Sequence, residues 1–317
     1  MCSPAQPSVS RTGIFRGMGA IALHIIQEDT PMRDCCFVAA IAAAASLAAC
    51  VAASPAMALG AVTYVSGKGV NSGVCATPAT ACRTFGYAIG QTSAAGEIKA
   101  LDPANYGALT IDKSITITGV PGTSVRTANA KNAVAINAAN AIVTLRGIDI
   151  DGGGVGTAGV VAYYARVLNI VGCVVRRFAN EGVAISGGWD GMSVTISDTI
   201  SSNNGKFGVD IVPGQKPVVA SMDHVTTNDN GVAGLRAYPG AIVTIVDSFA
   251  NNNASVGYLA VGGFPNATTM RLGRSAATGN QVGIQNLNFA TVQSFGDNAV
   301  LGNATDISGV VASISHK

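Results

Sequence analysis

Three aspartates follow apolar segments at nearly constant spacing, and their side chains could hold a cation. Asp198 follows "SVTIS", Asp223 follows "VASM" and Asp247 follows "VTIV". If these segments are strands of successive coils about 4.8 Å apart, the carboxylates stack at one corner. Their repulsion, roughly 1 kcal/mol in water, would be relieved by a cation. Calcium prefers such oxygen ligands, although solvated turn residues give the same pattern.

A second group of charged residues could take part in acid–base chemistry. Asp149 and Asp151 lie two apart in "RGIDIDGGG", so on a strand both side chains face the same side. Paired carboxylates at a suitable separation can catalyse hydrolysis. Arg176 and Arg177 could supply a base or bind a carboxylate. Adjacent arginines beside a turn are also common as surface charges, and the neighbouring Glu181 could pair with them.

Other catalytic centres lack the residues that they require. After Ala58 the histidines are His224 and His316. Two histidines argue against a Ser–His–Asp triad or a histidine-based zinc site. "GGGVGTAG" lacks the Gly-Lys-Ser/Thr ending of a phosphate-binding loop. The net charge is +2 without a basic stripe, which argues against a nucleic-acid partner. Apart from calcium, no cofactor is expected.

The segments that would position these residues repeat along the chain. Glycines that precede aliphatic segments recur at a nearly constant spacing: Gly159, Gly182, Gly208, Gly234, Gly257 and Gly283. A period in the twenties is typical of stacked supersecondary units. The segments are rich in Val, Ile and Thr, which favours strands, and one period holds three short strands and three turns. We therefore predict an all-β fold, a single-stranded right-handed parallel β-helix whose coils stack as a solenoid.

Alternation within a coil predicts which side chains form the interior. Val194, Ile196, Ile200 and Val209 are expected to point inward, each contributing on the order of 1.5 to 3 kcal/mol when fully buried. The turn before each glycine is rich in asparagine, which like glycine tolerates a left-handed backbone. Four asparagines stand four residues before a glycine and are expected to form a structural hydrogen-bonded ladder: Asn204, Asn230, Asn253 and Asn298.

A short helix and a disulfide are expected before the coils. "CRTFGYAIGQ" places Phe85, Ala88 and Ile89 at helical spacing, on a face suited to capping the open end of the core. Cys75 and Cys82 flank the loop "ATPATA" and should form a disulfide in an oxidising compartment. No comparable helix is visible at the C-terminal end, so the last, uncapped coil offers a surface for a second subunit and an oligomer.

The segment that ends at Ala58 differs from the rest of the chain. "CCFVAAIAAAASLAACVAASPAMA" ends in small residues at Ala56 and Ala58, as a bacterial secretory signal peptide does, and Met32 would be its conventional start. The alternative is lipid anchoring at Cys50, because "LAAC" resembles a lipobox. We expect a secreted or periplasmic protein without a transmembrane span. The expected parts are residues 1–58, extension and signal peptide; 59–95, first strand, disulfide loop and capping helix; and 96–317, the β-helix.

Residues 59–317 resemble the right-handed parallel β-helix, or pectate-lyase-like, superfamily. "YVSGKGVNSGVCATPATACRTF" and "GEIKALDPANYGALTIDKSITI" are similar to segments of bacterial secreted β-helix proteins without an assigned activity. Relatives include polysaccharide lyases, polygalacturonate hydrolases, uronate epimerases and phage tailspikes. The resemblance implies a polysaccharide partner. For the lyases it also implies calcium held by carboxylates and an arginine or lysine that abstracts the C5 proton.

The motifs in this chain serve stacking more than chemistry. The combined Asp-Asp, Gly-His-Gly and Arg-x-Lys signatures of polygalacturonases are absent from the sequence. We therefore expect a non-catalytic, carbohydrate-associating or surface structural protein. The alternative is a calcium-assisted polysaccharide lyase or uronate epimerase that uses the three corner aspartates with an arginine. A groove with carboxylates, arginines and Tyr163, Tyr164 or Trp189 would favour the enzyme, and a flat Asn, Ser and Thr face would not.

Overall fold

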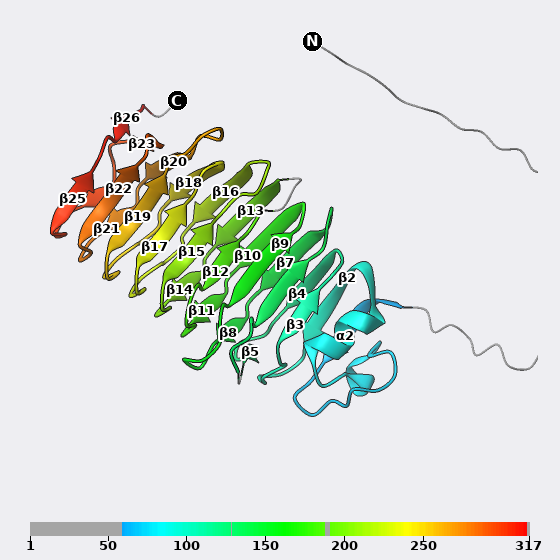
Figure 1. Ribbon diagram of the computed structural model, residues 1–317. Coiled ribbons are helices and arrows are strands. Elements are labelled where there is room, and N and C mark those ends of the chain that lie inside the picture. The colour runs from blue at the N-terminus through cyan, green and yellow to red at the C-terminus, as the bar shows by residue number, and fades with distance from the viewer. Residues whose placement is uncertain (1–58, 128, 188–190, 316–317) are drawn as a thin grey trace, which may run out of the picture. The chain divides into compact units, whose positions relative to one another are not determined.

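The computed structural model describes residues 59–127, 129–187 and 191–315 (Figure 1). Residues 1–58, Trp189 and His316 lie outside this part of the chain, and with them the expected signal peptide and the lipid-anchoring alternative at Cys50. The described strands follow one another around a coil, and equivalent strands of successive coils pair in parallel. The described chain is therefore the predicted all-β parallel β-helix.

Three sides make up each coil. One side is an eleven-stranded sheet within the described residues: β1 (Gly60–Val65), β2 (Thr92–Ala100), β4 (Ile115–Thr118), β7 (Ile142–Arg146), β10 (Val167–Val171), β13 (Met192–Ser197), β16 (Val218–Asp223), β18 (Ala241–Val246), β20 (Thr269–Gly273), β23 (Thr291–Ser294) and β26 (Ala312–Ser313). We call it the first sheet.

The second side is narrow. It holds the four strands β5 (Ser124–Arg126), β8 (Asp149–Asp151), β11 (Val174–Arg176) and β14 (Ile200–Ser202), and the described pair β21 (Ala276–Ala277) and β24 (Ala299–Val300). Single-residue bridges through Thr226 and Phe249 connect these two groups. This side is therefore continuous from coil to coil.

The third side is a nine-stranded sheet within the described residues, which we call the third sheet. Its strands are β3 (Leu109–Ile111), β6 (Val134–Asn137), β9 (Val160–Tyr164), β12 (Val183–Ile185), β15 (Phe207–Ile211), β17 (Ala233–Ala237), β19 (Val256–Val261), β22 (Val282–Leu287) and β25 (Thr305–Ser308).

The core is the interior of the coil, where aliphatic side chains stack in columns. Val194, Ile196 and Val209 are buried as predicted, but Ile200 is 42% exposed and Ser201 is buried in its place. The phase changes because the corner residue Asp198 has a left-handed backbone, with φ of 50°. The alternation of inward and outward side chains along a strand does not continue through such a residue, so the prediction that Ile200 points inward was wrong.

The periodic glycines are required by close packing rather than by a left-handed backbone. A Cβ on Gly208 would lie 2.6 Å from the carbonyl oxygen of Gly234, which real side chains do not tolerate. The left-handed positions of these turns are instead Asn203, Asp229 and Asn252. Asparagine and aspartate adopt this conformation at low cost, which explains why the polar phrase recurs.

The N-terminal segment packs a short helix against the first coils. Thr84 accepts a hydrogen bond from the Tyr87 N–H through its hydroxyl and so starts α2 (Phe85–Gln91), whose Phe85, Ala88 and Ile89 are buried. Figure 1 shows this helix beside β2. No helix among the described residues is long and apolar enough to cross a membrane.

The predicted disulfide between Cys75 and Cys82 is confirmed, with the one-turn helix η2 (Pro78–Thr80) in the loop that it closes. Such a bond indicates an oxidising compartment, outside the cytosol. Cys173 is free and buried, and burial raises the pKa of its thiol. It therefore behaves as a small apolar side chain.

At the other end of the described chain the core opens to solvent. Ile307 on β25 continues the column of Ile284, which is buried, yet Ile307 is 48% exposed. Within the described residues no helix covers this end, which leaves the prediction of a subunit contact there as a prediction.

Candidate functional site

Carboxylates on the outward side of the coils are bound by arginines that lie one period later, in the next coil. Among the described residues such pairs are Asp149–Arg176, Asp151–Arg177, Asp210–Arg236 and Asp247–Arg274. In three of them the arginine uses both Nε and an Nη atom on the two carboxylate oxygens. Such charge-assisted, two-point contacts fix both partners in place. The pairs are stacking contacts between coils.

Asp149 and Asp151 lie on one side of β8 as predicted, but they are not a free carboxylate pair. Asp151 is only 1% exposed, and its Oδ1 accepts hydrogen bonds of 2.9 Å from the Arg177 Nε and from the Gly153 N–H. Burial alone would raise its pKa, but these bonds and the charges of Arg177 and Arg176 outweigh burial and lower it. Asp151 is therefore a fixed anion and a poor proton donor.

The two adjacent arginines are each bound to an aspartate, Arg176 at one atom and Arg177 at two. Arg176 places its Nη2 atom 2.7 Å from Asp149 Oδ2, and Arg177 binds Asp151. The bond to Asp151 raises the pKa of the Arg177 guanidinium, so this side chain stays protonated and cannot accept a proton. The arginines were expected to pair with Glu181 but pair with the two aspartates instead. This pairing makes them unsuited to act as a lyase base.

The three aspartates predicted to stack at one corner do not occupy equivalent positions. Asp223 is the last residue of β16 and pairs in register with Ser197 and Val246, the residues before Asp198 and Asp247. The prediction was therefore wrong by one residue in the middle coil. It assigned every aspartate after an apolar segment to the turn, whereas Asp223 still belongs to the strand.

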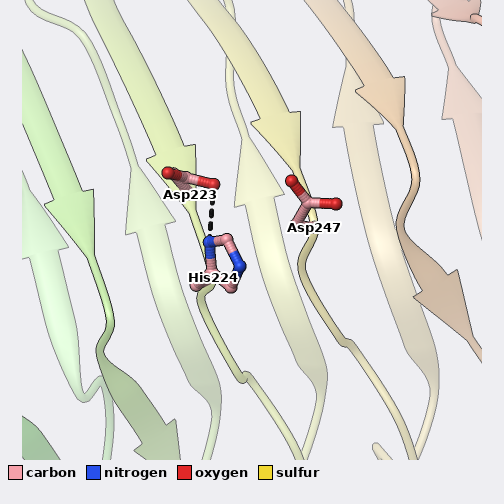
Figure 2. Close-up of side chains that lie close together, drawn as sticks. All are labelled: Asp223, His224 and Asp247. Carbon is pink, nitrogen blue, oxygen red and sulfur yellow. Dashed lines mark hydrogen bonds and ion pairs between the residues drawn. The ribbon is translucent and has the colours of Figure 1, made fainter.

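His224 takes the corner position between Asp198 and Asp247, and all three have left-handed backbones, with φ of 52°, 50° and 48°. The first and third sites of the predicted set thus remain, with an imidazole between them. Figure 2 shows Asp223, His224 and Asp247 together at the ends of β16 and β18, with 2.9 Å between His224 Nδ1 and Asp223 Oδ1. One ligand atom from each lies within 4.8 Å of the others.

Two carboxylates and an imidazole can bind a divalent cation, but this cluster has a competitor. Arg274 from the next coil donates hydrogen bonds of 2.8 and 2.7 Å to the two oxygens of Asp247 and lowers its pKa. A cation would have to displace this guanidinium or share Asp247 with it. Asp198 is not part of the cluster.

A buried asparagine ladder runs along the corner between the second and third sides. Asn204 donates through Nδ2 to Oδ1 of Asn230 at 3.1 Å, and Asn230 donates in the same way to Asn253 at 3.0 Å. The ladder continues through Asn280 and Asn303. The oxygens of the later four members also accept the backbone N–H of the ladder residue before them, and the Asn204 oxygen accepts the Phe178 N–H. The ladder thus satisfies backbone groups that the turn would leave unpaired.

Asn298 is not part of this ladder, and that prediction was wrong. Its Oδ1 accepts the Ser275 N–H at 2.9 Å and its Nδ2 donates to the Leu272 carbonyl, both at the corner between the first and second sides. A fixed offset to the next glycine cannot distinguish the two corners. Asn280, the true ladder member, stands three residues before Gly283 instead of four.

Sequence reasoning missed a second polar column at that first corner. The Ser248 hydroxyl accepts the Val225 N–H, the Ser275 hydroxyl accepts the Ser248 N–H, and Asn298 follows. The residue types differ from coil to coil, so no repeated letter marks the column. Only the constant spacing from the left-handed corner residue could have identified it.

The central column on the outer face of the first sheet carries mostly neutral polar side chains. The strand register aligns Thr116, Thr144, Asn169, Thr195, Ser221, Thr244, Arg271 and Gln293 in one column along its centre. All are at least partly exposed. This column matches the Asn, Ser and Thr surface expected of a non-catalytic protein, although the neighbouring Ile142 and Val219 are 43% and 51% exposed.

A charged and aromatic cluster on the third sheet was also missed. The Arg236 guanidinium lies 4.0 Å from the Phe207 ring centre, 5.3 Å from that of Tyr238, and binds Asp210. Burial, followed by the charge of Asp210, raises the pKa of Glu181. Asp210 and Arg236 are separated by one repeat of the sequence, and this separation could have predicted their contact between neighbouring coils.

The comparisons with known proteins support the fold and go no further. No family model matches the chain, and no curated protein matches it. The crystal structure of pectate lyase Pel9A superposes with a TM-score of 0.57 at 15% identity, over 80% of this chain and 77% of that one. ORF18 of Geobacillus virus E2 gives a TM-score of 0.37 at 17% identity, over 69% of this chain and 54% of that one. The described chain thus has a pectate-lyase-like β-helix fold.

Proposed function

We propose that this chain is a secreted, non-catalytic β-helix protein that associates with carbohydrate. The observation that carries the proposal is the commitment of Asp149, Asp151 and Asp247 to arginines of the next coil. Acid–base catalysis needs groups that can exchange protons, and lyase chemistry needs carboxylates free to hold a cation. Here the carboxylates and arginines neutralise one another and hold the coils together.

Secretion and carbohydrate association have separate support. The Cys75–Cys82 disulfide fits export, as does the alanine-rich segment before residue 59. The pectate lyase in the structural comparison is, by its description, a protein that acts on pectate. A shared fold does not transfer that activity, because functional sites are built on folds independently. Partly exposed Tyr163 and Tyr164 add aromatic surface on the third sheet.

The test is an incubation of the protein with pectate, alginate and other uronans, with calcium or with a chelator. The ultraviolet absorbance of the unsaturated uronide reports lyase action, and NMR of the recovered polymer reports C5 epimerisation. We expect neither change. We also expect the protein to be retarded in native gels that contain a glycan, because association does not require catalysis.

A second candidate, a calcium-assisted lyase or epimerase, is favoured by the cluster of Asp223, His224 and Asp247. It predicts a calcium-dependent rise in absorbance, or a change in uronate configuration, that is abolished by Asp223→Ala. Asp198→Ala is the matched control, because Asp198 lies at the same corner in the preceding coil but outside the cluster. Activity lost only with Asp223→Ala would replace the non-catalytic proposal with the enzymatic one.

A further inference from the structure

Exposed aromatic side chains gather at the corner between the third and first sheets. Tyr238 directly follows β17, Phe264 lies in the loop after β19, and Phe289 lies in the turn after β22. Phe264 and Phe289 are 99% and 102% exposed, and Tyr238 is partly exposed. We call these three residues the aromatic corner. Exposed large apolar side chains that lie close together, unlike scattered ones, commonly mark a binding surface.

The three aromatic residues belong to consecutive coils whose turns touch. A Cβ on Gly263 would lie 2.5 Å from the ring of Pro239, and a Cβ on Gly262 would lie 2.1 Å from the Asn288 carbonyl oxygen. The turns therefore form a row along the axis of the solenoid, with a coil spacing of about 4.8 Å. A row of this kind suits a chain of repeated ring units better than a single small ligand.

The turns that carry the aromatic corner are polar and uncharged, and the Arg236 guanidinium beside Tyr238 is bound by Asp210. The turns 238–240, 262–268 and 288–290 contain no Asp, Glu, Lys or Arg, but they contribute Asn266 and Asn288. A surface pocket of about 500 Å³ adjoins Phe289 and is lined by Asn286 and Asn288. Within the described residues the Asn286 Nδ2 donates to two carbonyls, whereas its Oδ1 accepts no hydrogen bond.

This composition selects among ligand classes. A sugar ring offers an apolar C–H face for stacking on an aromatic ring and a rim of hydroxyls for amide groups, and sites of this kind combine aromatic walls with a few polar groups. A uronan would require arginine or lysine partners for its carboxylates. A lipid surface would favour a contiguous apolar face with basic residues beside it. The turns of the corner contain no lysine or arginine, and both oxygens of Asp210 already bind the Arg236 guanidinium beside Tyr238.

We propose that the aromatic corner binds one strand of an uncharged polysaccharide, with sugar rings stacked on Tyr238, Phe264 and Phe289. Asn266 and Asn288 lie in the same turns as these rings and supply amides for sugar hydroxyls. This inference rests on the proposed carbohydrate association and assigns it a surface and a substrate class. The Asp223 cluster takes no part in it.

The experiment is affinity electrophoresis of protein produced from the full chain, in native gels that contain galactomannan, xyloglucan, mixed-linkage glucan, pectate or alginate. At least one neutral glycan should retard the protein, with little dependence on salt because no ion pair is involved. Phe264→Ala combined with Phe289→Ala should weaken that retention by about tenfold or more. Neither side chain is buried, so the variant should keep the wild-type circular dichroism spectrum and Tm.

Phe249→Ala is the matched control, because Phe249 is 48% exposed but lies on the second side of the coil. It should keep the wild-type retention. If the double variant binds the neutral glycan as well as wild type, or if only pectate or alginate retards the protein, the aromatic corner is not the site, although carbohydrate association stands. If no glycan retards the wild type, both proposals fail. Binding to phosphatidylcholine vesicles in place of glycans would mean that the corner serves a lipid surface, which also overturns the inference.

Discussion

Removal of one amide from the asparagine ladder should destabilise the whole solenoid. The proposed change is Asn230→Ala, at the second residue of the ladder. Asn230 is buried and makes side-chain hydrogen bonds in both directions: Nδ2 donates to Asn253 Oδ1 and to the Ser201 carbonyl, and Oδ1 accepts the N–H and the Nδ2 of Asn204. Alanine keeps none of these bonds.

The magnitude follows from the groups left without partners. The backbone N–H of Asn204 loses its acceptor in a buried corner, and the Asn204 Nδ2 keeps only a 3.4 Å contact with the Ser201 hydroxyl. The Asn204 Oδ1 still accepts the Phe178 N–H. A buried polar group without a partner costs about 1 to 3 kcal/mol. Two such groups give an expected loss of about 2 to 6 kcal/mol in the free energy of unfolding.

The assay is equilibrium unfolding in urea, followed by circular dichroism and extrapolated linearly to water. Asn132→Ala is the control, because Asn132 makes a single 3.5 Å side-chain hydrogen bond, to the Tyr163 hydroxyl, at the surface. Its effect should stay within about 0.5 kcal/mol. A loss below about 1 kcal/mol for Asn230→Ala, at an unchanged slope, would refute the view that the ladder holds the corner together.

Three further predictions concern stability. Replacing Cys75 and Cys82 together by serine should cost about 2 kcal/mol, measured by calorimetry, because the unfolded chain gains freedom in the loop. Gly208→Ala should cost about 1 to 3 kcal/mol through the clash of its Cβ. By contrast, Gly90→Ala in α2, where a Cβ meets nothing within 4 Å, should gain about 0.5 to 1 kcal/mol, and the opposite ranking in urea unfolding would count against the packing argument. Burial and Asp210 raise the pKa of Glu181 in the folded state. Protonation of Glu181 therefore stabilises the fold below the ordinary glutamate pKa, and this stabilisation is lost as the pH rises through the folded-state pKa. Glu181→Gln should therefore raise Tm at pH 7 and flatten its fall between about pH 4 and pH 7, and an unchanged profile would exclude this cause.

The fold is predictable from this sequence because one physical requirement is repeated in every coil. A strand of Val, Ile and Thr must bury alternate side chains, and a tight turn must follow it. These requirements recur at a nearly constant period, so errors in one coil are corrected by its neighbours. The Cys75–Cys82 disulfide and α2 are local features and could be predicted from short segments alone.

The candidate site is less predictable because it depends on single-residue register. The strand is one residue longer than predicted, so it ends at Asp223 and the corner position falls on His224. The predicted stack of three aspartates is therefore a cluster of two aspartates and a histidine. Asn298 was assigned to the wrong corner for the same reason. The arginine partners of Asp149 and Asp151 were visible as residues, but the pairing became clear only when the coils were stacked.

In the coils from Asp198 onward the irregular part of the solenoid is confined to one corner, and that is where we expect a specific function to reside. The left-handed corner residue and the ladder asparagine are six residues apart in four coils: Asp198 and Asn204, His224 and Asn230, Asp247 and Asn253, Arg274 and Asn280. Variation in the period must therefore arise after the ladder. The third-sheet strands begin two or three residues beyond it, but the connections to the first sheet range from the short turn 238–240 to the longer loop 262–268. At the regular corners, contacts between coils restrict the residue types and the length of the turn. The variable turns are not restricted in this way and can present Tyr238, Phe264 and Phe289 to a ligand.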